Sequence, residues 1–127
     1  MSDPPRVLVC EDAVGYRILI ARWIEDAGME VVAEADSWTE AERQAGALQP
    51  DVVVADLWMP ELDTEALVRV RQSAPAALVV SLSGLAVADQ PPLLDGTGAR
   101  VDLFLSKRQP PAQIVDALRE LVDAQAG

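Results

Sequence analysis

Five short apolar runs, alternating with segments of helical periodicity, place the strongest constraint on the fold of this chain. The runs are rich in β-branched residues and lie at 6–10, 30–35, 51–55, 77–82 and 100–105. The third run is continuously apolar from Val52 to Ala55, which is typical of a strand buried on both faces of a parallel sheet. Because a helical pattern follows each run, the order strand then helix occurs five times. This order predicts an α/β fold, with a doubly wound parallel sheet and helices on both faces.

Amphipathic patterns with three- and four-residue spacing predict the first two helices. The first helix has one apolar stripe, formed by Tyr16, Leu19, Ile20, Trp23, Ile24 and Ala27. Gly28 follows that stripe and predicts the end of the helix. Ser37 and Glu40 have the spacing of a capping box, which predicts the start of the second helix.

The later helices are marked by proline and by weaker patterns. A third helix is expected over about residues 63–73, and Pro110-Pro111 begins a last helix that ends near Asp123. Between residues 85 and 100 the periodicity weakens, because Pro91-Pro92 interrupts the stretch and two glycines follow. We therefore expect the fourth helix to be short or broken.

Length and composition indicate a single domain. The 127 residues, half of them hydrophobic, suffice for one core, which we expect to span about residues 6–123 without an output domain after it. No apolar run reaches the roughly 18 residues of a membrane span, and no secretion signal opens the chain. The only cysteine, Cys10, lies in an apolar run and is expected to be a buried, inert thiol. These features predict a cytoplasmic protein.

The charge distribution argues against some functions. The chain has 10 basic and 21 acidic residues, a net charge of −11, so phosphate backbones would repel it. Direct nucleic-acid binding is therefore not expected. The sequence contains no histidine, the commonest metal ligand and general base. Any chemistry must depend on carboxylates, hydroxyls and amines.

Polar side chains follow four of the five predicted strands at the point where each strand ends. They are Glu11, Asp12, Asp56, Ser83 and Lys107. Ligands of such sheets bind beyond the carboxyl ends of the strands, so these groups are expected on one rim. Three neighbouring carboxylates repel one another unless a cation intervenes, and carboxylate ligands suit Mg²⁺. A lysine and a hydroxyl opposite them would complete a site for a phosphoryl group, which Asp56 could accept covalently.

Each of these residues alone has a simpler explanation. An acidic residue or a serine after a strand is commonly a helix cap or a turn residue. A lone lysine is commonly a solvated amine. Glu11 and Asp12 would also favour the positive N-terminus of the first helix. The occurrence of all five polar residues at strand ends favours a site.

Four motifs on this rim resemble the receiver domains of two-component response regulators. They are Glu11-Asp12, Asp56-Leu-Trp-Met-Pro60, Ser83-Gly84 and Phe104-Leu-Ser-Lys107, in the family's order over essentially the whole chain. The resemblance implies a flavodoxin-like fold with five parallel strands in the order 2-1-3-4-5. It also implies a switch that a histidine kinase or a histidine phosphotransfer protein phosphorylates. The switch would regulate a downstream protein partner or an output domain, and homodimers are compatible with it.

The resemblance gives roles to the residues that would carry the chemistry. Asp56 would be the phosphoacceptor. The Mg²⁺ ligands would be Glu11, Asp12, Asp56 and the backbone carbonyl of Trp58. Lys107 would pair with the phosphoryl oxygens.

The resemblance also gives roles in switching and in the lifetime of the phosphate. Ser83 would donate its hydroxyl to the phosphoryl group, and Phe104 matches an aromatic position that moves inward on activation. Trp58 and Leu85 match the two positions that flank the path of the hydrolytic water. Because both side chains are apolar and neither can orient a water molecule as a carboxylate or an amide would, we expect slow hydrolysis.

Three positions depart from the family pattern. Arg108 follows Lys107 where the family often has proline, commonly after a cis bond. A cis bond before another residue costs roughly 2.5–4 kcal/mol, so we expect a trans or reshaped loop. Thr64 replaces a frequent glycine, so that turn must avoid a positive φ. Pro91-Pro92 falls in the fourth helix, on a face that many receivers use for partners.

Two alternatives would use the same rim. A phosphorylation-independent pseudo-receiver would keep it as part of a protein-binding module, and the Lys107-Arg108 junction and the interrupted fourth helix favour this alternative. A small Mg²⁺-dependent phosphohydrolase would also use an aspartate nucleophile, but it usually needs a general acid, and Trp58 supplies none. We therefore expect chemistry at Asp56 alone and no turnover of a small substrate.

Overall fold

The computed structural model describes residues 3–59, 63–90 and 100–126, and these form one parallel sheet with helices around it. The strands are β1 (Arg6–Cys10), β2 (Glu30–Ala35), β3 (Val52–Ala55), β4 (Leu78–Ser83) and β5 (Leu103–Ser106). The helices are α1 (Val14–Asp26), α2 (Trp38–Leu48), α3 (Thr64–Ser73) and α4 (Pro111–Ala126), with one 3₁₀ turn, η1 (Val87–Asp89). The strand order is β2-β1-β3-β4-β5, and every neighbouring pair is parallel. This confirms the predicted topology.

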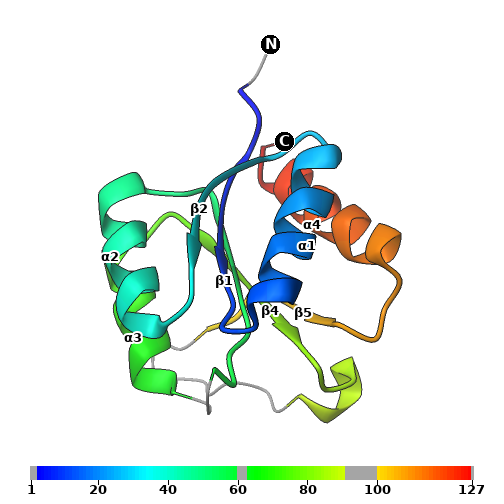
Figure 1. Ribbon diagram of the computed structural model, residues 1–127. Coiled ribbons are helices and arrows are strands. Elements are labelled where there is room, and N and C mark those ends of the chain that lie inside the picture. The colour runs from blue at the N-terminus through cyan, green and yellow to red at the C-terminus, as the bar shows by residue number, and fades with distance from the viewer. Residues whose placement is uncertain (1–2, 60–62, 91–99, 127) are drawn as a thin grey trace.

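Helices cover both faces of the sheet, α2 and α3 on one face and α1 and α4 on the other (Figure 1). Because successive side chains of a strand point to opposite faces, the sheet supplies two hydrophobic cores. One core joins the sheet to α2 and α3, and includes Leu8, Cys10, Ala41, Ala45, Leu67 and Val70. The other joins it to α1 and α4, and includes Val7, Val9, Ile20, Ile24, Ile114 and Leu118. The central strands are thus buried on both faces.

Local sequence signals set several helix boundaries. The Ser37 hydroxyl accepts a hydrogen bond from the N–H of Glu40 at 3.2 Å, which confirms the predicted N-cap of α2. Gly28 follows α1 with a φ of 89°, a conformation that favours glycine. The Asp63 carboxylate caps α3, and Thr64 is the first helical residue after it. This turn therefore needs no glycine at residue 64.

Strand β5 begins later than predicted. The carboxylate of Asp102 accepts the N–H of Val79 at 2.8 Å, where a regular ladder would use a backbone carbonyl. Arg71 of α3 lies 3.5 Å from the same carboxylate and donates to the carbonyl of Arg100 at 2.9 Å. Regular pairing with β4 therefore starts only at Leu103.

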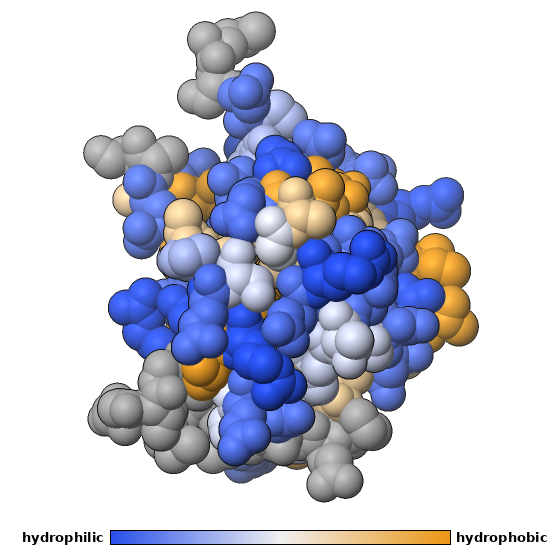
Figure 2. Space-filling view, turned by 90° about the vertical axis from the view of Figure 1, so that its left-hand side faces the viewer, coloured by the Kyte–Doolittle hydropathy of each residue, from blue (hydrophilic) through white to orange (hydrophobic). Residues whose placement is uncertain are grey.

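The buried stripe of α1 is narrower than predicted. Leu19 was expected to face the core, but 47% of it is exposed. Val14 and Ile18 are exposed to 58% and 57%, so three apolar side chains of this helix face solvent. By contrast, the face that carries α2 and α3 is mostly hydrophilic (Figure 2).

The described part of the stretch between β4 and β5 contains one 3₁₀ turn, as expected for a short or broken helix. Pro91-Pro92 lies outside the described residues, as does Pro60 of the aspartate motif. Gln90 follows the turn and is buried. Its amide nitrogen donates to the carbonyl of Leu105 at 2.9 Å, and its amide oxygen accepts from the hydroxyl of Ser81 at 2.8 Å. Gln90 thus connects this segment to both β4 and β5.

No helix in the described ranges has the length and hydropathy to cross a membrane.

Candidate functional site

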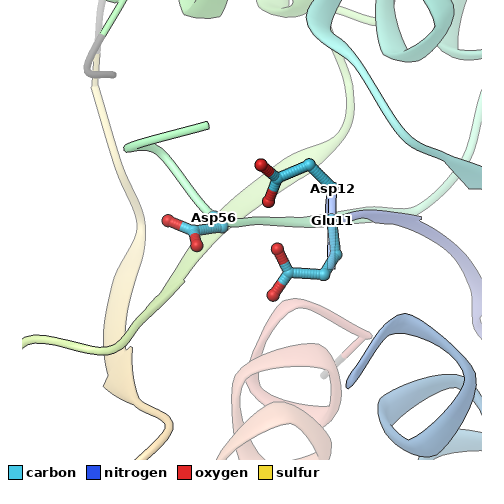
Figure 3. A group of neighbouring side chains, drawn as sticks. All are labelled: Glu11, Asp12 and Asp56. Carbon is cyan, nitrogen blue, oxygen red and sulfur yellow. The ribbon is translucent and has the colours of Figure 1, made fainter. Parts of the chain in front are cut away.

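Three carboxylates converge at the carboxyl ends of β1 and β3, where the strand order reverses. Glu11 and Asp12 follow β1, and Asp56 follows β3 (Figure 3). The N–H of Glu11 donates to the carbonyl of Ala35 at 2.9 Å, and that of Asp56 donates to the carbonyl of Cys10 at 3.1 Å. These bonds extend the sheet to the site and fix its backbone. Each residue offers a carboxylate oxygen, and the three oxygens lie within 4.8 Å of one another.

Lys107 reaches this cluster from the loop after β5. Its ammonium donates to Glu11 and to Asp56, the latter at 3.1 Å. Its backbone N–H donates to the carbonyl of Ser83 at 2.7 Å, which joins the ends of β4 and β5. Four strands therefore bring their predicted polar residues to one rim.

Burial and the ion pair between Lys107 and Glu11 shift the pKa of each of these two groups in opposite directions. Burial raises the pKa of the Glu11 carboxyl above its ordinary value, although the hydrogen bond and charge of Lys107 oppose this. Burial alone would lower the pKa of Lys107, but the hydrogen bond to Glu11 and the charge of Asp56 outweigh it, so this pKa is raised. The lysine is therefore a stable cation at neutral pH.

The donor set fits a magnesium ion. Three carboxylates and one ammonium leave two negative charges uncompensated, the amount that one divalent cation neutralises. Hard oxygen ligands are those that Mg²⁺ prefers. The nearby thiol of Cys10 is not expected to bind the metal. It is directed at the carbonyl of Ser37, 3.7 Å from its sulfur, and burial raises its pKa, so it stays protonated. Its predicted burial is confirmed.

The residues predicted to take part in switching and in control of hydrolysis lie at or near the same rim. The hydroxyl of Ser83 is buried and accepts the N–H of Leu85 at 3.1 Å. The N–H of Trp58 donates to the second oxygen of Asp56 at 3.0 Å, while its partly buried indole packs against the core on the α2 and α3 side. Leu85 is 37% exposed, and Phe104 is partly buried on β5, where it pairs with Ser81.

The loop after Lys107 has a contact that proline could not make. The backbone N–H of Arg108 donates to the hydroxyl of Ser106 at 3.1 Å. Its side chain also donates to the carbonyl of Gly84 at 2.9 Å, which links the loops after β4 and β5. This departure from the family pattern therefore adds local hydrogen bonds beside the site.

Tyr16 belongs to the site, which the sequence interpretation missed. It was predicted only as a member of the apolar stripe of α1. The ammonium of Lys107 lies 4.6 Å from the centre of its ring. Trp23 meets the same ring edge to face, with centroids 5.9 Å apart and an angle of 85°. Nothing in the local sequence signals this contact, because Lys107 lies on a distant strand end.

The sequence model of the response regulator receiver domain matches residues 7–119, which include every residue of this rim. The chain belongs to the response-regulator receiver family. Among its relatives, the chemotaxis protein CheY of Listeria monocytogenes is 31% identical over 116 residues, which are 91% of this chain and 96% of that protein. The CheY protein of Thermotoga maritima is also 31% identical, with the same coverage.

Solved receiver structures share the fold of this receiver. The NarL signal receiver domain of Mycobacterium tuberculosis superposes with a TM-score of 0.79 at 26% identity, covering 96% of this chain and 98% of that one. The response regulator domain of Thermotoga maritima CheB gives a TM-score of 0.77 at 26% identity, with 95% of each chain covered. The predicted family and its flavodoxin-like strand order are thus confirmed.

Proposed function

We propose that this receiver is a cytoplasmic switch in which Asp56 accepts a phosphoryl group from a phosphohistidine of another protein. The observation that carries the proposal is the convergence of Lys107 with two of the three carboxylates at the switch point of the sheet. Because these 127 residues include no histidine, the phosphohistidine lies outside them, in a histidine kinase or a phosphotransfer protein; a small phosphodonor is the alternative.

The residues of the rim divide the chemistry among them. An oxygen of Asp56 forms the new P–O bond while the P–N bond to the donor breaks, and the electron pair stays with the imidazole nitrogen. The ammonium of Lys107, which lies 3.1 Å from Asp56, would then pair with the negatively charged phosphoryl oxygens. Glu11, Asp12, Asp56 and the carbonyl of Trp58 would hold Mg²⁺, which supplies positive charge for the same oxygens.

The phosphate would change the end of β4 and the end of β5 together. It adds about −1.5 to −2 charges and three acceptor oxygens. Ser83 accepts the N–H of Leu85 but keeps its own hydroxyl hydrogen for the phosphate. Because the Ser83 carbonyl binds the N–H of Lys107, a shift of one residue moves the other. Phe104 on β5 would move with these strand ends, and a downstream protein or an output domain would bind the changed surface.

The direct test of this proposal is the mass of the protein after incubation with Mg²⁺ and acetyl phosphate. The wild type is expected to gain one phosphoryl group, and fragment masses are expected to place it on Asp56. Multiple turnover of a small phosphate ester would instead support a phosphohydrolase.

Replacing Trp58 by Asn and Leu85 by Glu is expected to speed loss of the phosphate about tenfold, equivalent to about 1.4 kcal/mol in the barrier. An amide and a carboxylate at these positions can accept a hydrogen bond from the attacking water molecule, whereas the indole, which is a donor only, and the isobutyl group cannot. The measurement is the decay of phosphorylated protein after removal of the donor. If the folded double variant binds Mg²⁺ normally and decays at the wild-type rate, these residues do not control the water.

Ile18→Glu is expected to slow phosphorylation by a phosphotransfer protein about tenfold, a loss of about 1.4 kcal/mol. Val14 and Ile18 lie one turn apart in the N-terminal part of α1, which follows Glu11 and Asp12 in the chain, and both are more than half exposed. A protein that presents a phosphohistidine to Asp56 is expected to contact this end of the helix. A glutamate at residue 18 would be buried in that complex and would lose its hydration. Phosphorylation by acetyl phosphate is the control and should not change. Equal slowing with both donors would argue against docking on this helix.

A further inference from the structure

We propose that Tyr16 is a positioning residue, whose ring face holds the ammonium of Lys107 in the site when Glu11 and Asp56 turn to Mg²⁺. The inference deepens the function proposed above and rests on it, because it concerns how the lysine is kept ready for the phosphoryl group.

The geometry is that of a cation–π contact. The ammonium of Lys107 lies 4.6 Å from the ring centroid of Tyr16, inside the roughly 6 Å range of such contacts. The lysine side chain is only 21% exposed, so little water competes with the ring. The near-perpendicular contact with Trp23, at 85°, helps to fix the plane of the Tyr16 ring.

The ring matters because the other partners of Lys107 are shared with the metal. In the structure the ammonium binds Glu11 and Asp56, both of which belong to the carboxylate cluster. Once these two carboxylates bind a divalent cation, the lysine competes with that cation for their oxygens and meets a like charge. A long, flexible lysine would then turn toward water. The ring face carries no formal charge and is no ligand for a hard cation, so it stays available to the ammonium.

The hydroxyl of Tyr16 takes no part in this contact. It is buried and has no hydrogen-bond partner among the described residues. A phenylalanine ring should therefore hold the lysine as well as tyrosine does, whereas leucine would fill a similar space without an attractive face. This gives a matched pair of variants, Tyr16→Phe and Tyr16→Leu.

The composition of the chain makes the contact directly observable. Lys107 is its only lysine and Tyr16 its only tyrosine. Protein labelled with ¹³C in lysine alone gives one set of ε-methylene signals, which the ring current of an aromatic face shifts upfield. We expect this upfield shift in the wild type without metal, and we expect most of it to remain at saturating Mg²⁺. Tyr16→Phe should keep the shift and Tyr16→Leu should lose it. A wild-type signal that moves to the position of a solvated lysine on addition of Mg²⁺ would overturn the inference.

Phosphorylation kinetics give the second measurement. At saturating Mg²⁺, Tyr16→Leu is expected to react with phosphoramidate about fivefold to tenfold more slowly than wild type, and Tyr16→Phe at nearly the wild-type rate. Equal slowing of both variants would show that the hydroxyl, not the ring, matters, and would refute the proposal. If the wild type is not phosphorylated, the proposed function fails while the methylene signal still decides the role of Tyr16. If Tyr16→Leu does not fold, the wild-type titration and Tyr16→Phe decide it.

Discussion

Asp56→Asn is expected to abolish phosphorylation, whereas wild-type protein with Mg²⁺ and acetyl phosphate gains one phosphoryl group. Asparagine has nearly the same size and keeps an acceptor for the N–H of Trp58, which lies 3.0 Å from the present carboxylate. It lacks the anionic oxygen that must attack phosphorus, and the resonance of the amide makes its oxygen a poor nucleophile. Intact-protein mass spectrometry measures the result directly.

Asp36→Asn is the matched control for this experiment. Asp36 is an exposed carboxylate just past the end of β2, at the same edge of the sheet but outside the carboxylate cluster. This variant should be phosphorylated as the wild type is. Phosphate on the Asp56→Asn protein would place the acceptor elsewhere. No phosphate on the wild type, under conditions that label other receivers, would favour the phosphorylation-independent pseudo-receiver.

The fold was predictable because its strands and helices follow simple patterns. The run from Val52 to Ala55 predicted a strand buried on both faces, and the structure buries all four residues. The ends of the strands and helices were harder to predict, since side chains far apart in sequence determine them. The bond from the N–H of Val79 to the carboxylate of Asp102 makes β5 begin later than its sequence pattern indicates. Gln49 ends α2 with a φ of 48°, and its side-chain amide donates to the carbonyl of Ser73 at 2.8 Å.

The carboxylates and the lysine of the site were predictable for a different reason. Residues that follow parallel strands meet at one edge of the sheet, so Asp56 and Lys107 could be placed together without knowing any contact. Tyr16 and Gln90 could not be found in this way. Tyr16 has the spacing of a core residue, and Gln90 follows a weak pattern, so the roles of both depend on which side chains the folded sheet brings beside them.

Asp12→Asn is expected to weaken Mg²⁺ binding about tenfold to hundredfold. Asp12 is the exposed member of the cluster, whereas Glu11 is buried and bonded to Lys107, so the Asp12 change disturbs the fold least. Removing one of three negative charges within a few ångströms of a divalent cation removes a large part of its attraction. Calorimetric titration with MgCl₂ measures the change. Asp26→Asn, at the far end of α1, is the control and should bind as the wild type does.

Lys107→Met should change Mg²⁺ affinity in the opposite direction. In the structure the ammonium pairs with both Glu11 and Asp56, so a metal ion must compete with it for these two carboxylates. Without the lysine this competition and the like-charge repulsion disappear, and binding should tighten about tenfold. Circular dichroism shows whether the variant is folded. Two changes of opposite sign at one cluster are expected only if the carboxylates hold the metal. If Asp12→Asn and Lys107→Met leave the titration unchanged, Mg²⁺ binds elsewhere.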